Sequence, residues 1–400
     1  MTGSVQPPGL RPGTTASDTS WPAAAWLDPA DARLEDLCAV VEQETDPAEY
    51  PRAEIVRGVP VYAARALAVG DRRDVQAELV HALLDGPGIV VLAGAFEPAV
   101  VDRVSEAFRG LIEAQRASGA VAGDHFAAAG SNDRVWNALE KLAVADPDAF
   151  AAYYANDALA LVCDAWLGPD HQVTSQVNVV NPGGAAQSPH RDYHLGFRTT
   201  AGAARYAAHI HRLTPALTLQ GAVAHVDMPL ESGPTLYLPH SQKYPHGYLV
   251  ADREEFREYF QAHHVQLPLA KGDAVFFNPA LLHGAGTNRT ADVRRMANLL
   301  QVSSAFGRAM ETVDRARVST AVLPALRRLR DAGASERELA NVVAAAAEGY
   351  AFPTDLDRDP PVDGLAPPSQ ADLLRAAVAE GWDDARFAAT LAEHTARRHG

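Results

Sequence analysis

Apolar residues recur every three or four positions through most of the first third of the chain, a spacing that predicts amphipathic helices. The predicted helices cover Asp31–Glu44, Arg73–Leu84, Pro98–Ser118, Asp133–Val144 and Asp146–Trp166. The uninterrupted apolar run Ile89–Leu92 predicts one short buried strand. The first third is therefore expected to be mainly helical, with a single strand.

The pattern changes after Gly168, where short apolar or alternating runs are separated by turns rich in Gly and Pro. These runs predict strands at Val173–Val180, Leu217–Val226, Thr235–Leu238, His264–Leu269, Ala274–Phe277 and Met296–Ser303. Many short strands with such turns are typical of an antiparallel sandwich or open barrel. The expected fold class is a mainly β core with helical additions.

Helical spacing returns after about Met310, and a Pro- and Asp-rich linker at Pro353–Pro368 precedes two terminal helices, Gln370–Ala379 and Asp383–Ala396. The linker makes 370–400 a candidate lid or oligomerisation element. The expected organisation has four parts: a disordered tail over 1–20, a mainly helical part over 21–168 that packs on the core, a β core over 169–309, and a helical extension over 310–400.

Charge and composition narrow the possible partners. The 400 residues are 47% hydrophobic, enough for a substantial core, and 35 basic against 50 acidic residues give a net charge of −15. Nucleic acids and anionic membranes both require a basic surface, so neither is an expected partner. No apolar run reaches the length of about 18 residues that a membrane span requires. A small-molecule substrate is expected, and a homodimer is possible.

Cysteine usage indicates a reducing compartment. Cys38 and Cys163 lie far apart and form no Cys-x-x-Cys pattern. A disulfide framework or a zinc–thiolate site is therefore not expected. The N-terminus also lacks the charged start and apolar segment of a signal peptide. The expected location is the cytoplasm.

The pattern His190-x-Asp192 ends an extended run and offers an imidazole and a carboxylate that can face one ion. With a second His from elsewhere, such a pair forms the 2-His-1-carboxylate triad that suits non-haem Fe(II) and leaves positions open for a cosubstrate and O2. The pattern alone is a weak signal, because a loop His and a helix-capping Asp produce it as well.

His283 is the candidate third ligand, because it follows the predicted strand Ala274–Phe277 after enough strand-rich chain to return to the first pair around a small barrel. Arg294 lies eleven residues later, at the start of the last predicted strand. A guanidinium can form a two-pronged hydrogen bond with a carboxylate. A dicarboxylate such as 2-oxoglutarate requires such a partner at its far end.

These motifs, in this order, resemble the phytanoyl-CoA dioxygenase family of Fe(II)/2-oxoglutarate oxygenases, which have a double-stranded β-helix (jelly roll, cupin-like) fold. The set comprises His190-x-Asp192, Leu238-Pro-x-Ser241, Lys271–Phe277, His283-Gly-Ala-Gly-x-Asn-Arg289 and Arg294, and the resemblance covers roughly 85–305. It implies that His190, Asp192 and His283 bind iron and that Arg294 binds 2-oxoglutarate.

The resemblance also implies weaker candidates. Gln176 and Asn178, on the strand before the His-x-Asp loop, are candidates for cosubstrate contacts. The family often has a hydroxyl two residues after the second His, where this chain has Ala285. Thr287 or Asn288 is then the candidate source of that hydrogen bond.

Other polar residues have ordinary structural explanations. His225-x-Asp227 is a second His-x-Asp pattern, at a strand end, where a structural role is expected. Arg295 alternates to the strand face opposite Arg294, so solvent or a surface salt bridge is expected for it. Arg289 is an alternative carboxylate partner, in a less rigid loop.

The residues around the first pattern are expected to lie near the site. Tyr193, His194 and Phe197 would line its mouth if His190 and Asp192 bind metal, although ordinary packing fits them equally well. His209 and His211 are expected to be surface or substrate-pocket groups rather than metal ligands.

The resemblance predicts an Fe(II)/2-oxoglutarate-dependent dioxygenase that uses O2 and hydroxylates a small-molecule metabolite, with succinate and CO2 as products. The acidic net charge favours a bacterial small-molecule oxygenase over a peroxisomal acyl-CoA enzyme. Related iron halogenases lack the carboxylate ligand, so Asp192 favours hydroxylation, although desaturation, ring closure and epoxidation use the same triad. Two alternatives remain. A cupin-like isomerase or dioxygenase without 2-oxoglutarate needs the triad but not Arg294, and a non-catalytic binding protein on the same barrel needs neither.

Overall fold

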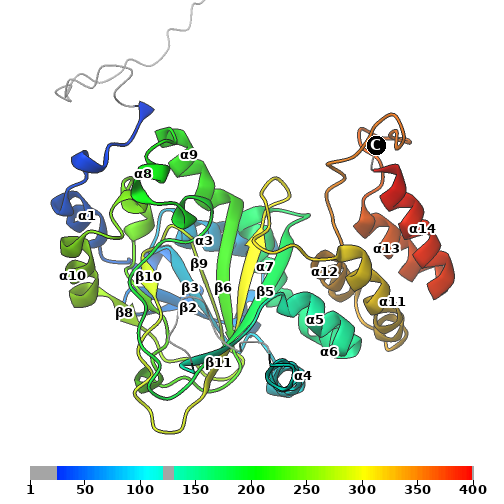
Figure 1. The fold of residues 1–400 in the computed structure, drawn as a ribbon, viewed down its shortest axis with the longest axis horizontal. Coiled ribbons are helices and arrows are strands. Elements are labelled where there is room, and N and C mark those ends of the chain that lie inside the picture. The colour runs from blue at the N-terminus through cyan, green and yellow to red at the C-terminus, as the bar shows by residue number, and fades with distance from the viewer. Residues whose placement is uncertain (1–24, 120–129, 399–400) are drawn as a thin grey trace, which may run out of the picture.

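The computed structural model describes residues 25–119 and 130–398, so the predicted tail over 1–20 lies outside the described residues. The described residues form a double-stranded β-helix with helices packed around it (Figure 1). The strands are β1 (Ala53–Val56), β2 (Val59–Ala63), β3 (Ile89–Ala93), β4 (Asn132–Val135), β5 (Gln172–Val180), β6 (Thr218–Ala224), β7 (Leu236–Tyr237), β8 (Val265–Gln266), β9 (Ala274–Phe277), β10 (His283–Gly284) and β11 (Arg295–Ser303). The predicted class, a mainly β core with helical additions, is confirmed.

Within the described residues, the larger sheet has the order β1-β2-β3-β9-β6-β11-β5-β4 and the smaller sheet the order β10-β7-β8. The long strand β11 lies between β5 and β6 and pairs with both in antiparallel register. Because side chains alternate along a strand, the two faces of β11 have different surroundings. Met296, Leu300 and Val302 belong to the main apolar core, whereas Ala297 and Leu299 line a cavity between the sheets.

Helices cover the outer face of the larger sheet and extend to the C-terminus. The α-helices are α1 (Leu34–Val41), α2 (Ala64–Leu67), α3 (Arg72–Leu84), α4 (Pro98–Ala117), α5 (Ala138–Ala145), α6 (Pro147–Tyr154), α7 (Asp157–Leu167), α8 (Thr200–Ala203), α9 (Ala208–Leu213), α10 (Glu254–His263), α11 (Arg315–Asp331), α12 (Glu336–Ala346), α13 (Gln370–Glu380) and α14 (Asp384–Arg397). Among the described residues, no helix is both long and apolar enough to cross a membrane.

The N-terminal part contributes more strand than the sequence predicts, because β1, β2 and β4 join the larger sheet. The β1–β2 hairpin turns at Arg57 and Gly58, whose φ angles are 52° and 78°. A two-residue hairpin turn with both φ angles positive usually carries Asn or Asp first, so Arg57 gives no turn signal. The predicted single-strand, mainly helical first third is therefore wrong in this respect.

Two predicted helices are also interrupted. The interval Asp133–Val144 begins as the polar edge strand β4, and the left-handed Asn137 (φ 50°) precedes α5. The interval Asp146–Trp166 breaks between α6 and α7, where the Asn156 side chain accepts a hydrogen bond from the Leu159 amide and caps the second helix. Both interruptions are local turn chemistry inside otherwise helical spacing.

The C-terminal helices pack on the rest of the chain rather than standing apart. Leu326, Val343 and Phe387 are buried in the same apolar core as Leu300 of β11. The buried Arg315 donates to the Ala345 and Val173 carbonyl oxygens, 2.6 Å each, and so joins α11 to α12 and β5. Figure 1 shows α13 and α14 beyond α11 and α12, at the edge of the molecule. A lid or oligomerisation role for 370–400 stays a prediction.

The second His-x-Asp pattern lies inside this framework. His225 follows β6 and is buried, with Nδ1 2.8 Å from the Ser105 hydroxyl and Nε2 3.2 Å from the Tyr153 hydroxyl. Burial, and to a smaller extent the charge of Arg109, lowers the pKa of His225 to about 3. Both ring nitrogens are thus occupied by hydroxyls, as a structural histidine requires.

His225 should make the protein acid-sensitive below pH 7. Its pKa in the unfolded chain is about 6.5, so between that value and the folded value the unfolded chain binds one more proton. Above about pH 7, His225 is neutral in the folded and the unfolded chain, so it adds no pH dependence to the free energy of unfolding. Below about pH 7 the free energy of unfolding falls, by about 2 kcal/mol between pH 7 and pH 5. Urea unfolding at both pH values should show a smaller loss in His225→Gln than in the wild type. Equal losses would contradict this assignment.

Candidate metal centre

His190 and His283 are held side by side by their backbones. The His190 amide donates to the His283 carbonyl oxygen at 2.9 Å, and the His283 amide donates to the His190 carbonyl oxygen at 3.1 Å. A Cβ on the neighbouring Gly284 would lie only 3.0 Å from the Gln187 carbonyl oxygen, so glycine permits this close approach. The two imidazole ring centroids are consequently 4.5 Å apart.

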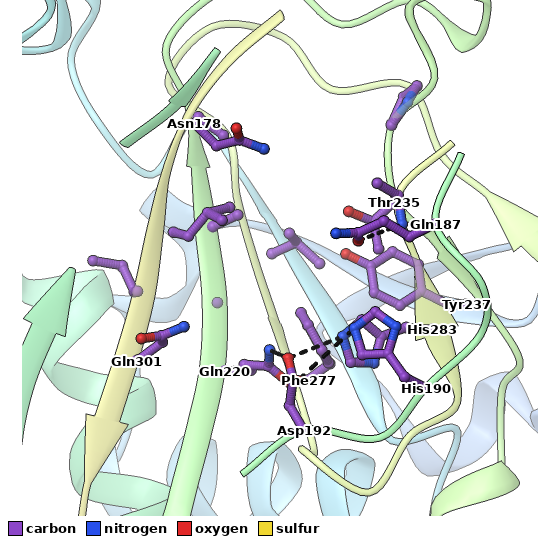
Figure 2. A pocket seen from close by; sticks show the side chains of 18 of the residues that line it. Asn178, Gln187, His190, Asp192, Gln220, Thr235, Tyr237, Phe277, His283 and Gln301 are labelled. Carbon is purple, nitrogen blue, oxygen red and sulfur yellow. Dashed lines mark hydrogen bonds and ion pairs between the residues drawn. The ribbon is translucent and has the colours of Figure 1, made fainter. Parts of the chain in front are cut away.

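Asp192 completes a cluster of three groups that face one another (Figure 2). Its backbone amide donates to the Pro279 carbonyl oxygen at 3.0 Å, which fixes the loop against the segment that leads to β10. The Nε2 atoms of His190 and His283 lie 3.8 Å and 3.4 Å from the two carboxylate oxygens of Asp192. One ligand atom from each residue lies within 4.8 Å of the other two, so one ion can contact all three.

In each histidine ring, the hydrogen bond of Nδ1 leaves Nε2 available to a metal. Nδ1 of His190 lies 2.8 Å from the Ser188 carbonyl oxygen, and Nδ1 of His283 lies 2.9 Å from the Leu281 carbonyl oxygen. A carbonyl oxygen only accepts, so each Nδ1 carries a proton and Nε2 is the nitrogen whose lone pair can bind a metal. This is the usual support of metal-binding histidines, and it presents both Nε2 atoms to the space beside Asp192.

The charges in the cluster favour a bound cation. Burial alone would raise the pKa of Asp192, but hydrogen bonding with His283, the charges of both histidines and hydrogen bonding with Gln220 lower it to about 2. Burial, followed by the neighbouring His283, lowers the pKa of His190. At neutral pH the carboxylate is ionised and the neutral form of His190 is favoured. The unprotonated Nε2 of His190 and the carboxylate of Asp192 are then both ready to bind a metal ion.

Gln220 and two aromatic rings surround the three ligands, and the sequence did not identify any of them. Gln220 of β6 donates from its amide nitrogen to Asp192 Oδ2. The rings of Phe277 and Tyr237 have centroids 4.8 Å and 6.5 Å from that of His283. The only sequence signal was the inward alternation of β6 and β9, which does not distinguish a ligand neighbour from ordinary packing.

The cluster opens into a cavity of about 610 Å³ between the two sheets. Alternate residues of β11 line it, namely Arg295, Ala297, Leu299 and Gln301, and the neighbouring Leu300 also reaches it. At about 3.3 Å per residue, this face of β11 is roughly 20 Å long from the first to the last. Figure 2 shows Gln220 beside Asp192, and Thr235 and Tyr237 on the side of His283. The cavity therefore has room for a second small molecule besides one that is bound to the metal.

Arg294 and Arg295, at the start of β11, point to opposite sides of the sheet. Arg295, and not Arg294 as predicted, faces the cavity. Arg294 is half exposed outside the cavity, with one guanidinium nitrogen 2.9 Å from Asp133 Oδ2 and Nε 3.2 Å from Asn181 Oδ1. Arg295 is only 7% exposed and lines the cavity. The expectation of solvent or a surface salt bridge for Arg295 is wrong, because the strand phase is shifted by one residue from the predicted one.

Of the remaining candidates for cosubstrate contacts, some line the cavity and others do not. Asn178 lines the cavity, whereas Gln176 is buried and hydrogen-bonded to Arg134 and Gln301. Ala285 lines the cavity, as expected for its position after His283. Its proposed substitutes bind backbone instead. The Thr287 hydroxyl accepts from the Ala186 amide, and the Asn288 amide donates to the Val180 and Val293 carbonyl oxygens. The hydroxyl-bearing residues of the lining are Ser188, Thr235 and Tyr237.

The residues expected near the mouth lie at different depths. Phe197 lines the cavity and is 55% exposed. Tyr193 is buried outside the cavity lining, and Nδ1 of His194 lies 2.6 Å from the Thr214 hydroxyl. Of the other candidates, Arg289 and His209 are exposed, while His211 is buried with Nε2 3.1 Å from the Ala203 carbonyl oxygen. None of these last three residues lines the cavity.

Comparison with known families supports the relation that the motifs imply. The sequence profile of the phytanoyl-CoA dioxygenase (PhyH) family matches residues 84–296, which is just over half of the chain. The match contains all three residues of the cluster. A search of curated proteins finds no match.

Several solved structures are similar in fold. The α-ketoglutarate-dependent epimerase SnoN from nogalamycin biosynthesis is 21% identical, over 58% of this chain and 82% of that one, with a TM-score of 0.42. AviO1 from Streptomyces viridochromogenes Tue57 is 18% identical over 58% and 97% (TM-score 0.42). The carbocyclase SnoK is 19% identical over 59% and 87% (TM-score 0.42). At this level of similarity, no activity or ligand of those proteins is carried over to this chain.

Gln220 should strengthen metal binding although it is not a ligand. Gln220→Leu removes the hydrogen bond that orients Asp192, and loss of such support typically lowers metal affinity by about 10- to 100-fold. Calorimetric titration with Mn(II), and with Fe(II) under anaerobic conditions, measures the change. Gln301→Leu is the matched control, because Gln301 also faces the cavity but bonds to Gln176 and to none of the three ligands. Unchanged affinity in Gln220→Leu would contradict this role.

Proposed function

This chain belongs to the phytanoyl-CoA dioxygenase family, and we propose that it is an Fe(II)/2-oxoglutarate-dependent dioxygenase that hydroxylates a small-molecule metabolite and forms succinate and CO2. The observation that carries the proposal is the cluster of His190, Asp192 and His283 at the wall of a cavity that opens to solvent near Phe197. Two imidazoles and one carboxylate are the donor set that suits non-haem Fe(II).

The residues present fit the cofactors of the family, which are Fe(II), 2-oxoglutarate and O2. His190 and His283 offer Nε2, and Asp192 offers a carboxylate held ionised by its neighbours. When bound, iron and 2-oxoglutarate supply the O2-dependent oxidising chemistry. The chain's own part is to hold the ligands, bind the oxo acid and orient the substrate.

Arg295, rather than Arg294, is the residue we propose to bind the distal carboxylate of 2-oxoglutarate. It is the buried one of the pair, and it is steadied by the Ser232 and Gly286 carbonyl oxygens at 3.1 Å and 3.4 Å. Both contacts use the same terminal nitrogen, so the guanidinium fork is held at one point. Burial lowers the pKa of Arg295 to about 10, and the side chain therefore stays cationic at neutral pH.

The surroundings of Arg295 suit a dicarboxylate that reaches from the metal. Tyr237 acts electrostatically on Arg295, and Thr235 and Tyr237 both lie on the side of the cavity that carries His283 (Figure 2). Leu267, Leu269 and Val275 also line it, and such apolar side chains exclude water from the bound oxo acid. In that low-dielectric setting, the pairing of a guanidinium with a carboxylate is stronger than in water.

The retained carboxylate of Asp192 supports hydroxylation as the outcome, because it occupies the position that related halogenases leave open for chloride. Gln220 donates to Oδ2 of that carboxylate, and Nε2 of His283 lies 3.4 Å from the same oxygen. A substrate entering past Phe197 would reach the three ligands from the exposed side of the cavity.

Exchanging each arginine separately tests the proposal. Arg295→Gln should raise the KM for 2-oxoglutarate by at least about 30-fold, because a charge-assisted hydrogen-bonded pair contributes at least about 2 kcal/mol. Arg294→Gln should change it less than about twofold, since that side chain pairs with Asp133 outside the cavity. The measurement is iron-dependent succinate formation at varied 2-oxoglutarate.

Three results would contradict the proposal. A raised KM in Arg294→Gln but not in Arg295→Gln would return the role to Arg294. Oxygenation of a substrate without any oxo acid would favour a dioxygenase that does not use 2-oxoglutarate. A product that mass spectrometry shows to have lost two hydrogens, as desaturation or ring closure requires, instead of having gained one oxygen atom would exclude hydroxylation.

A further inference from the structure

A relay of hydrogen bonds between three side chains ends at Gln301, on the cavity wall. One terminal nitrogen of Arg134 donates to Gln176 Oε1 at 2.6 Å, and the amide nitrogen of Gln176 donates to Gln301 Oε1 at 3.0 Å. A guanidinium has donors only, so Gln176 meets it with its oxygen and offers its nitrogen to Gln301. The oxygen of the Gln301 amide is therefore occupied, and its nitrogen is the end that remains for the cavity.

Gln301 lies close to the metal ligands without touching them. It pairs directly with Gln220 across β6 and β11, and Gln220 donates to Asp192 Oδ2. Adjacent strands are about 5 Å apart, so Gln301 begins that far from the residue that supports the carboxylate ligand. Figure 2 shows Gln301 across the cavity from His190 and His283. A group bound to the Gln301 amide therefore lies within the part of the cavity that the metal ligands face.

The amide nitrogen of Gln301 is a buried donor that needs an acceptor. The residue is only 8% exposed, and within the described residues the one hydrogen bond of its side chain is that from Gln176. Gln220 does not supply the acceptor, because no hydrogen bond joins the two side chains in the described part of the chain. A buried donor without an acceptor is unfavourable, so this wall favours a ligand that brings an acceptor oxygen.

Two other carboxamides line the cavity, and neither marks the substrate in the same way. Gln187 is also held by its oxygen, which accepts from a backbone amide at 3.2 Å. Figure 2 shows Gln187 beside Thr235, on the side of the cavity where 2-oxoglutarate is proposed to bind. Asn178 Oδ1 accepts from the Asn132 amide nitrogen at 3.0 Å, and two carboxamides can pair in either direction. Gln301 is thus the amide donor that is oriented by a relay and placed opposite the proposed oxo acid site.

Apolar and aromatic side chains surround this donor. The same cavity is lined by Trp136, Phe197, Leu299, Leu300 and Met310. The sulfur of Met310 lies 3.9 Å from the amide nitrogen of Gln176, so this side chain is beside the relay. These surfaces suit an apolar ring. The Gln301 amide is neutral and gives no charge assistance to a carboxylate, so it suits a neutral oxygen.

We propose that Gln301 is a specificity-determining residue, which donates a hydrogen bond to a neutral carbonyl or hydroxyl oxygen that the substrate carries on an apolar ring. The assignment to the substrate, rather than to any bound molecule, rests on the proposed oxygenase function. Because Gln301 lies next to Gln220 on the neighbouring strand, the oxygen that it holds also fixes which ring carbon is turned toward the three metal ligands.

A pair of matched probes tests this site without any need for turnover. The probes are 1-tetralone and tetralin, which share a bicyclic carbon frame and differ in one ketone oxygen. Each is titrated calorimetrically into the full-length protein without iron or oxo acid. The ketone selectivity is the Kd of tetralin divided by that of 1-tetralone, and it should be at least about fivefold larger in wild type than in Gln301→Leu, the effect of one hydrogen bond from a buried donor. Gln301→Met, which keeps the side-chain length but has no donor, should match Gln301→Leu.

Control variants separate this site from the other sites of the cavity. Arg294→Gln, outside the cavity, and Arg295→Gln, at the proposed 2-oxoglutarate site, should both keep the full ketone selectivity. Loss of the selectivity in Arg295→Gln but not in Gln301→Leu would overturn the proposal, as would equal selectivity in wild type and both Gln301 variants, or no saturable binding of 1-tetralone.

A metal titration excludes a different role for the same amide. If Gln301→Leu lowered the Mn(II) affinity as much as Gln220→Leu, the Gln301 amide would serve the metal ligands through Gln220, and the proposal would be wrong. If iron-dependent succinate formation fails while the ketone selectivity depends on Gln301, the oxygenase function fails and the binding site for the neutral oxygen stands.

Discussion

The pair of backbone hydrogen bonds between His190 and His283 is the contact on which the site depends. It joins a loop that follows β5 to the short strand β10, two segments that are far apart in the sequence. It brings His283 to the loop that carries both His190 and Asp192, while a carbonyl oxygen of its own segment orients each ring. The bridge thus converts two separate local conformations into one three-ligand cluster. The glycine at 284 allows the two backbones to approach closely enough to form it.

The second constraint is the alternation of side chains along β11. Even-numbered residues such as Met296 and Leu300 bury apolar surface against the helices, and odd-numbered residues face the cavity. One strand therefore serves both stability and the site, and its phase decides which of two adjacent arginines is available to a ligand. A slip of one residue would exchange the two faces completely. The nine-residue pairing with β5 fixes the phase against such a slip.

These two constraints explain how much could be read from the sequence. The order of motifs was sufficient to predict the β core, the family and the residues His190, Asp192 and His283 as a group, because each motif directly follows a recognisable strand. The phase at Arg294 and Arg295 could not be read, because two identical side chains in succession give no periodic signal. The hairpin at Arg57 and the polar edge strand β4 were missed because local turn chemistry and tertiary pairing, rather than hydrophobic spacing, determine them. Gln220 and Arg134 become visible only when strands β6 and β4 are placed beside the cavity.

One cavity is proposed to hold both iron, on His190, Asp192 and His283, and 2-oxoglutarate. The most direct measurement is anaerobic titration of the full-length protein with Fe(II) and 2-oxoglutarate, followed by the visible charge-transfer absorption of the chelated oxo acid. One iron and one 2-oxoglutarate should bind per chain, and the band should be lost when His190 and Asp192 are both replaced by Ala. Iron binding that is unaffected by the double replacement, or no Fe(II) binding at all, would contradict it.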